Sequence, residues 1–205
     1  MHREILTAKQ NELLPYLKLF RRKYYLVGGT AIALHIGHRR SVDFDLFSLT
    51  RLNKKDIRDK LTRFPFKISR ISEDTDQIHF LINDIKITFF HYPYKILHPL
   101  TLGQFLYMPS LLTLASMKAY AIGRRAKWKD YVDLYYIIRD FCTIEEISSE
   151  AVSNFGEYFS EKLFREQLSF HKDIDYSEPV EFIVPAPSEE EIKRFLIDRA
   201  IDIGI

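Results

Sequence analysis

A glycine pair followed at a fixed distance by two aspartates constrains this chain more than any other feature of its sequence. Gly28-Gly29-Thr30 is followed by twelve residues and then by Asp43-Phe44-Asp45. The β-type run 23–27 ends at the glycines, and the run after them, 31–36, has the composition of a helix. Polar and apolar residues alternate over 41–47, which indicates a half-buried strand. The order strand, glycine turn, helix, strand predicts a mixed α/β unit.

These two motifs suit phosphate chemistry when they occur together. A glycine pair between a strand and a helix lets backbone N–H groups approach a phosphate at the positive end of the helix. In the predicted strand, Asp43 and Asp45 point to the same face, about 6.6–7 Å apart along the backbone. Two such carboxylates can hold one or two divalent cations, which would bind the phosphates of a nucleoside triphosphate (NTP). Neither motif is specific alone, because acidic pairs and glycine turns are both common.

Two longer segments around these motifs resemble a known family. YLVGGTAIALHIGHRRSVDFDLFS and the later LASMKAYAIGRRAKWKDYVDLYYI are similar, in this order, to conserved blocks of the AbiEii/AbiGii toxin family of nucleotidyltransferases, within the DNA polymerase β-like superfamily. The resemblance covers roughly residues 20–140. It implies an α+β fold, in which a polymerase-β-like mixed sheet flanked by helices is followed by a helical C-terminal domain.

The resemblance also implies a reaction and a set of site residues. The reaction is transfer of a nucleoside monophosphate from an NTP to a hydroxyl, with Mg²⁺ or Mn²⁺ as the metal. Gly28, Gly29 and Thr30 would hold the triphosphate, and Asp43 and Asp45 would bind the metal. From the helical side, Lys118 and Asp130 would complete the catalytic set. Some family members modify tRNA ends as toxins of abortive-infection or toxin–antitoxin systems, so RNA is an expected acceptor and an antitoxin an expected partner.

The basic residues before the aspartates are further candidates for nucleotide binding. Arg39 or Arg40 can grip a γ-phosphate, because a guanidinium fork matches phosphate oxygens. We assign Arg40 and Ser41 to the predicted nucleotide site. Ser41 shares the predicted strand face of Asp43, so it either binds a phosphate or pairs with the adjacent strand.

One position departs from the superfamily pattern. A third carboxylate is expected on a later central strand, where this chain has Lys86-Ile87-Thr88-Phe89 and Thr88 occupies the slot. A hydroxyl is a poor general base and a weaker metal ligand than a carboxylate. Asp84 has the same strand parity but lies about 13 Å away along the strand. Either Asp130 or Asp133 supplies the missing charge, or one metal suffices, or catalysis is weakened.

The hydrophobic pattern divides the chain into two domains. We expect a palm-like nucleotidyltransferase domain over 1–105 and a helical domain over 106–205. The expected elements of the remaining chain are helices and strands with these bounds: helices over 54–64, 111–122, 128–141, 144–170 (one or two) and 189–201, and strands near 66–72, 77–82 and 85–92, the last two joined by a turn at Asn83-Asp84.

Three charged residues of the helical part have a structural alternative to a catalytic role. Lys118 interrupts an apolar stripe, so it must either reach solvent or meet an anion. Asp130 and Asp133 lie one turn apart near a helix start, where they would stabilise the helix dipole, and Asp133 would pair with Lys129 on the surface.

The charge distribution is asymmetric although the net charge is only +2. Residues 1–70 contain 16 Lys or Arg against 6 Asp or Glu, whereas residues 136–205 contain 7 against 16. A basic N-terminal part suits a nucleotide or RNA ligand, or the two halves attract each other. The basic turn Arg124, Arg125, Lys127 and Lys129 is either an RNA or triphosphate contact or a solvated loop.

The composition excludes several classes of protein. A single cysteine rules out an intramolecular disulfide, and the sequence has no run of about 20 apolar residues. We therefore expect a soluble cytoplasmic protein without a membrane partner. The predicted function is nucleotidyl transfer to RNA or another hydroxyl acceptor. The alternatives are a catalytically weakened nucleotide- or RNA-binding module and a small-molecule nucleotidyltransferase of the antibiotic-resistance kind.

Overall fold

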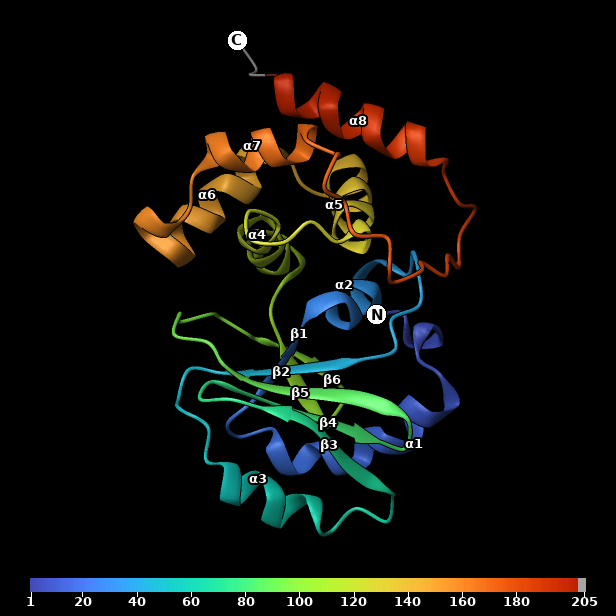
Figure 1. Ribbon diagram of the computed structural model, residues 1–205, viewed down its shortest axis with the longest axis vertical. Coiled ribbons are helices and arrows are strands. Elements are labelled where there is room, and N and C mark those ends of the chain that lie inside the picture. The colour runs from blue at the N-terminus through green and yellow to red at the C-terminus, as the bar shows by residue number, and fades with distance from the viewer. Residues whose placement is uncertain (203–205) are drawn as a thin grey trace. The chain divides into compact units, whose positions relative to one another are not determined.

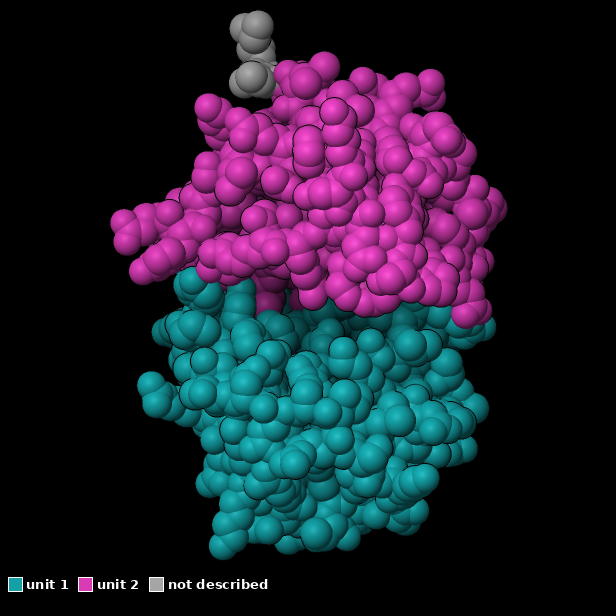
Figure 2. Space-filling view, viewed as in Figure 1, with its two compact units in different colours: residues 1–110 teal, residues 111–205 magenta. Residues whose placement is uncertain are grey.

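The computed structural model describes residues 1–202, which form two compact units. Unit 1 is Met1–Ser110, and unit 2 begins at Leu111 (Figure 2). Within the described residues, no helix has both the length and the apolar character needed to cross a membrane.

Unit 1 is built on a mixed sheet that has seven strands within residues 1–110 (Figure 1). The strand order is β3-β4-β5-β2-β1-β7-β6. The pairs β2–β5 and β1–β7 are parallel, and the other neighbours are antiparallel. The strand bounds are β1 (Tyr25–Val27), β2 (Phe44–Ser48), β3 (Ile68–Glu73), β4 (Gln77–Ile82), β5 (Ile85–His91), β6 (Leu100–Leu102) and β7 (Leu106–Met108).

The two faces of this sheet differ because side chains alternate along each strand. On one face, Phe44, Leu46 and Phe89 are completely buried, and the ring of Phe20 lies 4.7 Å from that of Phe89. The helices α1 (Ala8–Leu17) and α3 (Lys54–Leu61) lie on the same side of the sheet (Figure 1). The opposite face carries Asp45, so the aromatic core supports the strand from behind.

Several local predictions for unit 1 are confirmed. The helix after the glycines, α2 (Gly28–Ile36), ends at Gly37, whose φ of 69° is the left-handed conformation of a helix C-cap. Asn83 and Asp84 join β4 and β5 with φ values of 52° and 64°. Two consecutive left-handed residues are typical of the primed turn of a two-residue hairpin.

Two element bounds near the motif differ from the prediction. The helix α2 begins at Gly28, so the glycines form its first turn rather than a preceding loop. The strand β2 begins at Phe44, so Ser41 and Asp43 lie before it and not in it. The hydroxyl of Thr30 donates to the backbone carbonyl of Asp43, which ties that residue to α2.

The hairpin β6–β7 was not predicted. Each of its strands has three residues, which is too short for a convincing alternation of polar and apolar side chains. β7 joins the sheet by pairing in parallel with β1, so the sheet of unit 1 extends to Met108.

Unit 2 is helical within its described residues, as predicted. Its helices are α4 (Leu111–Ile122), α5 (Trp128–Asp140), α6 (Ile144–Phe155), α7 (Glu161–Ser169) and α8 (Glu189–Ile201). α4 packs against α5, α6 and α7, and α8 packs against α5 and α7. A 3₁₀ turn at Gly156–Tyr158 separates α6 from α7, so the expected helical region 144–170 is two helices.

The segment 171–187, which connects α7 to α8, is fastened to the start of α5. Asp175 forms an isolated β-bridge with Lys127, and its carbonyl accepts a hydrogen bond of 3.0 Å from the Trp128 N–H. The carboxylate of Glu178 pairs with both Lys127 and Lys129. Two cations of the basic turn are therefore neutralised within unit 2 and do not belong to a freely solvated loop.

We predict that this contact makes the stability of the protein depend on acid pH. Burial alone would raise the pKa of Glu178, but hydrogen bonds from Lys127 and Lys129 hold that pKa at about 2. Because the folded-state pKa lies below the unfolded value, this stabilisation is present above about pH 4.5 and is lost as pH falls towards 2. Glu178→Gln should lower the free energy of unfolding, measured by urea denaturation, at about pH 6.5 but hardly at about pH 2.

Glu157→Gln is the matched control, because Glu157 is exposed in the 3₁₀ turn before α7. It should leave the unfolding free energy unchanged at both pH values. An equal effect of Glu178→Gln at both pH values would contradict the ion-pair explanation.

Candidate active site

The pairing of β1 with β2 brings the two sequence motifs together. The strands are antiparallel, and Val27 lies opposite Asp45. Because Gly28 follows Val27 directly, the first turn of α2 lies beside the aspartate. On its other side β2 pairs with β5, where Thr88 is opposite Asp45. The carboxylate of Asp45 thus lies between a helix N-terminus and the Thr88 hydroxyl.

The two glycines are required by close approach as well as by backbone conformation. Gly28 has a φ of 73°, and a β-carbon there would overlap the carboxylate of Asp45. A β-carbon on Gly29 would lie 2.6 Å from Nη2 of Arg39 and 3.2 Å from Oγ of Ser41. Any larger residue would therefore displace a polar group of the site.

The N-terminus of α2 has the properties of an anion-binding site. Val27 provides no side-chain cap, and the first turn contains no acidic residue. The first N–H groups of a helix have no partner inside it and carry partial positive charge. Arg39 is 3% exposed, and its guanidinium lies beside Gly29. A helix N-terminus and a guanidinium together suit a phosphate group.

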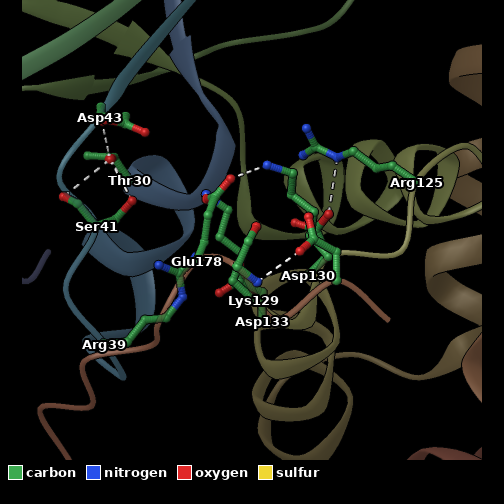
Figure 3. Close-up of polar contacts among 12 residues, drawn as sticks. Thr30, Arg39, Ser41, Asp43, Arg125, Lys129, Asp130, Asp133 and Glu178 are labelled. Carbon is green, nitrogen blue, oxygen red and sulfur yellow. Dashed lines mark hydrogen bonds and ion pairs between the residues drawn. The ribbon is translucent and has the colours of Figure 1, made fainter. Parts of the chain in front are cut away.

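Thr30 has a structural role in this arrangement. Its side chain is buried, and its hydroxyl lies 2.9 Å from Oγ of Ser41 and donates to the carbonyl of Asp43 (Figure 3). These bonds hold the segment that leads into β2 against α2. Because the hydroxyl is used in these bonds, the group of Thr30 that we predict to contact a triphosphate is its backbone N–H.

Asp43 and Asp45 are both half-buried. The carboxylate of Asp45 forms no hydrogen bond or ion pair within residues 1–202. No cluster of three or more His, Cys, Asp or Glu side chains suited to a metal occurs in that range. Two carboxylates match the way Mg²⁺ is held in phosphate-transfer sites, where substrate phosphates and water supply the other ligands.

Thr88 contacts a residue that the sequence analysis did not single out. Its Oγ1 lies 3.1 Å from Nδ1 of His79, which is opposite Thr88 on β4. Thr88 is 6% exposed, and His79 is half-buried. The pairing of His79 with Thr88 could have been predicted from the sequence, because a two-residue turn at Asn83-Asp84 fixes which residues of β4 and β5 lie opposite each other. Asp84 lies in that turn and pairs with Lys9, away from Asp45.

In unit 2, Lys118 is held between two buried carboxylates. Its Nζ lies 2.7 Å from Oδ1 of Asp130 and 2.9 Å from Oδ2 of Asp133, and both aspartates are completely buried. Nε of Arg125 lies 3.2 Å from the other oxygen of Asp130 (Figure 3). Lys118 therefore does not reach solvent.

The alternative that Asp133 pairs with Lys129 on the surface was wrong. Asp133 is buried and forms an ion pair with Lys118, whereas Lys129 forms an ion pair with Glu178. A helical pattern places Asp133 one turn from Asp130 but does not show that both face the same lysine on α4.

The structure thus assembles the predicted residues in two groups. Unit 1 brings together Gly28, Gly29, Thr30, Ser41, Asp43 and Asp45, with Arg39 beside them. Arg40 is half-buried, and its Nη1 lies 3.5 Å from the carbonyl of Glu4. Unit 2 brings together Lys118 and Asp130. The roles of these residues in nucleotide binding and catalysis stay predictions.

Comparison with known proteins shows what the chain is similar to. The family model described as "Nucleotidyl transferase AbiEii toxin, Type IV TA system" matches residues 16–104. An uncharacterized protein of Aquifex aeolicus (strain VF5) is 35% identical over 121 residues. This match covers 57% of the chain and 58% of the length of that relative.

Solved structures share the fold over nearly the whole chain. MenT4, a nucleotidyltransferase toxin from Mycobacterium tuberculosis H37Rv, has a TM-score of 0.61 at 13% identity. The match covers 95% of this chain and 85% of the MenT4 chain. JHP933 from Helicobacter pylori has a TM-score of 0.53 at 13% identity, with coverage of 94% and 88%. The expected α+β fold is confirmed. The segment 16–104, which contains the glycine pair, both aspartates and Thr88, is similar to the AbiEii family of nucleotidyltransferase toxins.

Proposed function

We propose that this protein is a nucleotidyltransferase that moves a nucleoside monophosphate from an NTP to a hydroxyl acceptor and acts as a toxin. The observation that carries the proposal is the position of Asp45, whose carboxylate lies against Gly28 at the start of α2. A helix N-terminus that binds phosphate beside carboxylates that bind a divalent cation is the combination that nucleotidyl transfer needs. The family of residues 16–104 supports it.

The residues of unit 1 divide the work of this reaction. The N–H groups of Gly28 and Gly29 and the guanidinium of Arg39 hold the triphosphate, with Ser41 beside them. Asp43 and Asp45 would hold Mg²⁺ or Mn²⁺, which neutralises charge on the phosphates and on the leaving group when bound. The acceptor hydroxyl attacks the α-phosphorus in line, and pyrophosphate leaves. Catalysis then consists of positioning and electrostatic stabilisation.

RNA, including tRNA ends, is the acceptor that the surface of unit 1 favours. Nine of its cations are exposed and form no ion pair with another described residue: Arg3, Lys18, Arg22, Arg51, Lys55, Arg63, Lys67, Lys86 and Lys95. Such cations attract a polyanion, whereas a small-molecule acceptor does not need them. An antitoxin protein is the partner expected from the description "Type IV TA system" of the matched family.

A nucleotide-binding module without turnover is the second candidate. It is favoured by Thr88, which stands opposite Asp45 where the superfamily pattern has a carboxylate. Binding needs the helix N-terminus and Arg39, but turnover also needs a group that activates the acceptor.

We predict that Asp43→Asn/Asp45→Asn abolishes transfer. The protein is incubated with each α-³²P-labelled NTP, Mg²⁺ or Mn²⁺, and total cellular RNA, and the label in RNA, protein and small molecules is measured. Removing both carboxylates should lower the rate by at least about 100-fold, because charge stabilisation is the main catalytic term. Asp59→Asn, on the exposed side of α3, is the control and should keep full activity.

Label that enters RNA with the wild type alone would name the NTP and the acceptor class. Equal labelling by the double variant would contradict the assigned role of the aspartates. Nucleotide binding by calorimetry without any labelling by the wild type would favour the binding module.

A second prediction separates the two adjacent arginines. Arg39→Lys should weaken binding of a non-hydrolysable NTP by about tenfold, because lysine lacks the two-pronged guanidinium contact with phosphate. Arg40→Lys should weaken this binding less than Arg39→Lys does, since Nη1 of Arg40 lies 3.5 Å from the carbonyl of Glu4. Calorimetry on folded protein checks both. The reverse result would return the nucleotide contact to Arg40.

A third prediction separates structure from catalysis at Lys118. Lys118→Met should destabilise the protein by about 3–5 kcal/mol, because two buried carboxylates lose their counter-charge. Lys162→Met, at an 87% exposed side chain, should change the unfolding free energy by less than about 1 kcal/mol in urea denaturation. An unchanged stability of Lys118→Met would contradict the buried ion pair.

The triple variant Lys118→Met/Asp130→Asn/Asp133→Asn removes all three charges and should recover part of the lost stability. If it folds but transfers no label, Lys118 and Asp130 have the predicted catalytic roles. If it folds and transfers label as the wild type does, their role is to stabilise unit 2.

A further inference from the structure

A row of four residues crosses the sheet of unit 1 at the level of the proposed metal ligands. Val27 on β1, Asp45 on β2, Thr88 on β5 and His79 on β4 are successive cross-strand partners. Partners directly opposite each other present their side chains on the same face. The row therefore begins at the glycine turn and ends at His79, with Asp45 and Thr88 between them.

The direction of this row matches the direction of the proposed reaction. In an in-line displacement, the attacking oxygen and the leaving oxygen lie on opposite sides of the phosphorus. The groups assigned to the leaving phosphates, Gly29 and Arg39, lie on the β1 and α2 side of Asp45. The acceptor must then approach from the β5 and β4 side, where Thr88 and His79 lie.

His79 has a ring nitrogen available on this side. Nδ1 of His79 lies 3.1 Å from Oγ1 of Thr88, whereas Nε2 forms no hydrogen bond with any part of the chain that the structure describes. When Thr88 Oγ1 accepts from the Nδ1–H, the ring lone pair is on Nε2. Thr88 itself is too weakly basic to replace a carboxylate.

We propose that His79 performs the role of the missing third carboxylate, with Thr88 as its positioning residue. This inference rests on the proposed nucleotidyl transfer. Nε2 accepts the hydrogen bond of the acceptor hydroxyl and then its proton. The acceptor oxygen bonds to the α-phosphorus, the bond from that phosphorus to the bridging oxygen breaks, and pyrophosphate leaves with the electron pair. His79 returns the proton to solvent before the next turnover.

The charges around His79 are compatible with this role. Burial lowers the pKa of His79, and so does Lys86 on β5, whereas Asp45 on β2 and Asp74 at the start of the β3–β4 turn raise it. The net effect is a pKa below the usual value of 6.5. This direction favours the neutral imidazole, the form that can accept a proton.

The test uses the full chain, the NTP accepted in the labelling assay, and total RNA as acceptor. His79→Asn keeps a polar group near Thr88 but removes the Nε2 position. It should lower kcat/KM for the acceptor by about 100-fold or more, which is the usual size of a general-base contribution. The fall in activity of the wild type at acid pH should be absent from the pH profile of His79→Asn. Affinity for a non-hydrolysable NTP, measured by calorimetry, should be unchanged.

Matched variants test the positioning role. Thr88→Val has nearly the same volume but cannot accept from Nδ1, so it should lower kcat for the acceptor. Thr88→Ser keeps the hydroxyl and should restore activity. His91→Asn is the control, because His91 is also half-buried on β5 but pairs with Asp76, and it should transfer label normally.

The outcomes separate this inference from the proposed function. Transfer by the wild type together with normal kinetics of His79→Asn would overturn the role of His79 and leave nucleotidyl transfer intact. Loss of NTP affinity in His79→Asn would also overturn it, because the residue would then act on the nucleotide. Absence of transfer by the wild type with every NTP would overturn both proposals.

Discussion

The pairing of Val27 with Asp45 is the contact on which the rest of unit 1 depends. It places the carboxylate of Asp45 against the first turn of α2. The two groups are so close that only glycine fits at position 28. A phosphate on that helix end would be repelled by the carboxylate. Positive charge between the two groups removes this conflict, and Arg39 together with a divalent cation can supply it. The geometry therefore explains why glycine, arginine and aspartate occur together in one short motif.

Much of this fold could be predicted because the signals are local. The helices follow from their hydrophobic period, and the β4–β5 hairpin follows from Asn83-Asp84, whose left-handed backbone suits these residues. The start of β2 could not be predicted, because it depends on the hydroxyl of Thr30 reaching the carbonyl of Asp43. The sequence predicted that Lys118 reaches solvent or meets an anion, but it did not show that Lys118 pairs with both Asp130 and Asp133. That pairing depends on how α4 packs on α5.

Thr88 occupies a buried position of the sheet, opposite Asp45 and beside His79. The register of β2 with β5 places Thr88 opposite Asp45. A carboxylate at a position that is 6% exposed would need a charged partner or a bound cation to offset its desolvation. A hydroxyl that is hydrogen-bonded to an imidazole avoids this cost.

The charge asymmetry of the chain has different structural consequences in the two units. In unit 2, many charges are satisfied internally, as Lys118 is by two aspartates and as Glu178 is by two lysines. In unit 1, Glu73 binds Lys54, Arg58 and Arg70, yet other cations, such as Arg51 and Lys55, remain exposed. The uncompensated positive charge belongs to the same unit as the glycines that we propose to bind phosphate, which supports the proposal of a polyanionic acceptor.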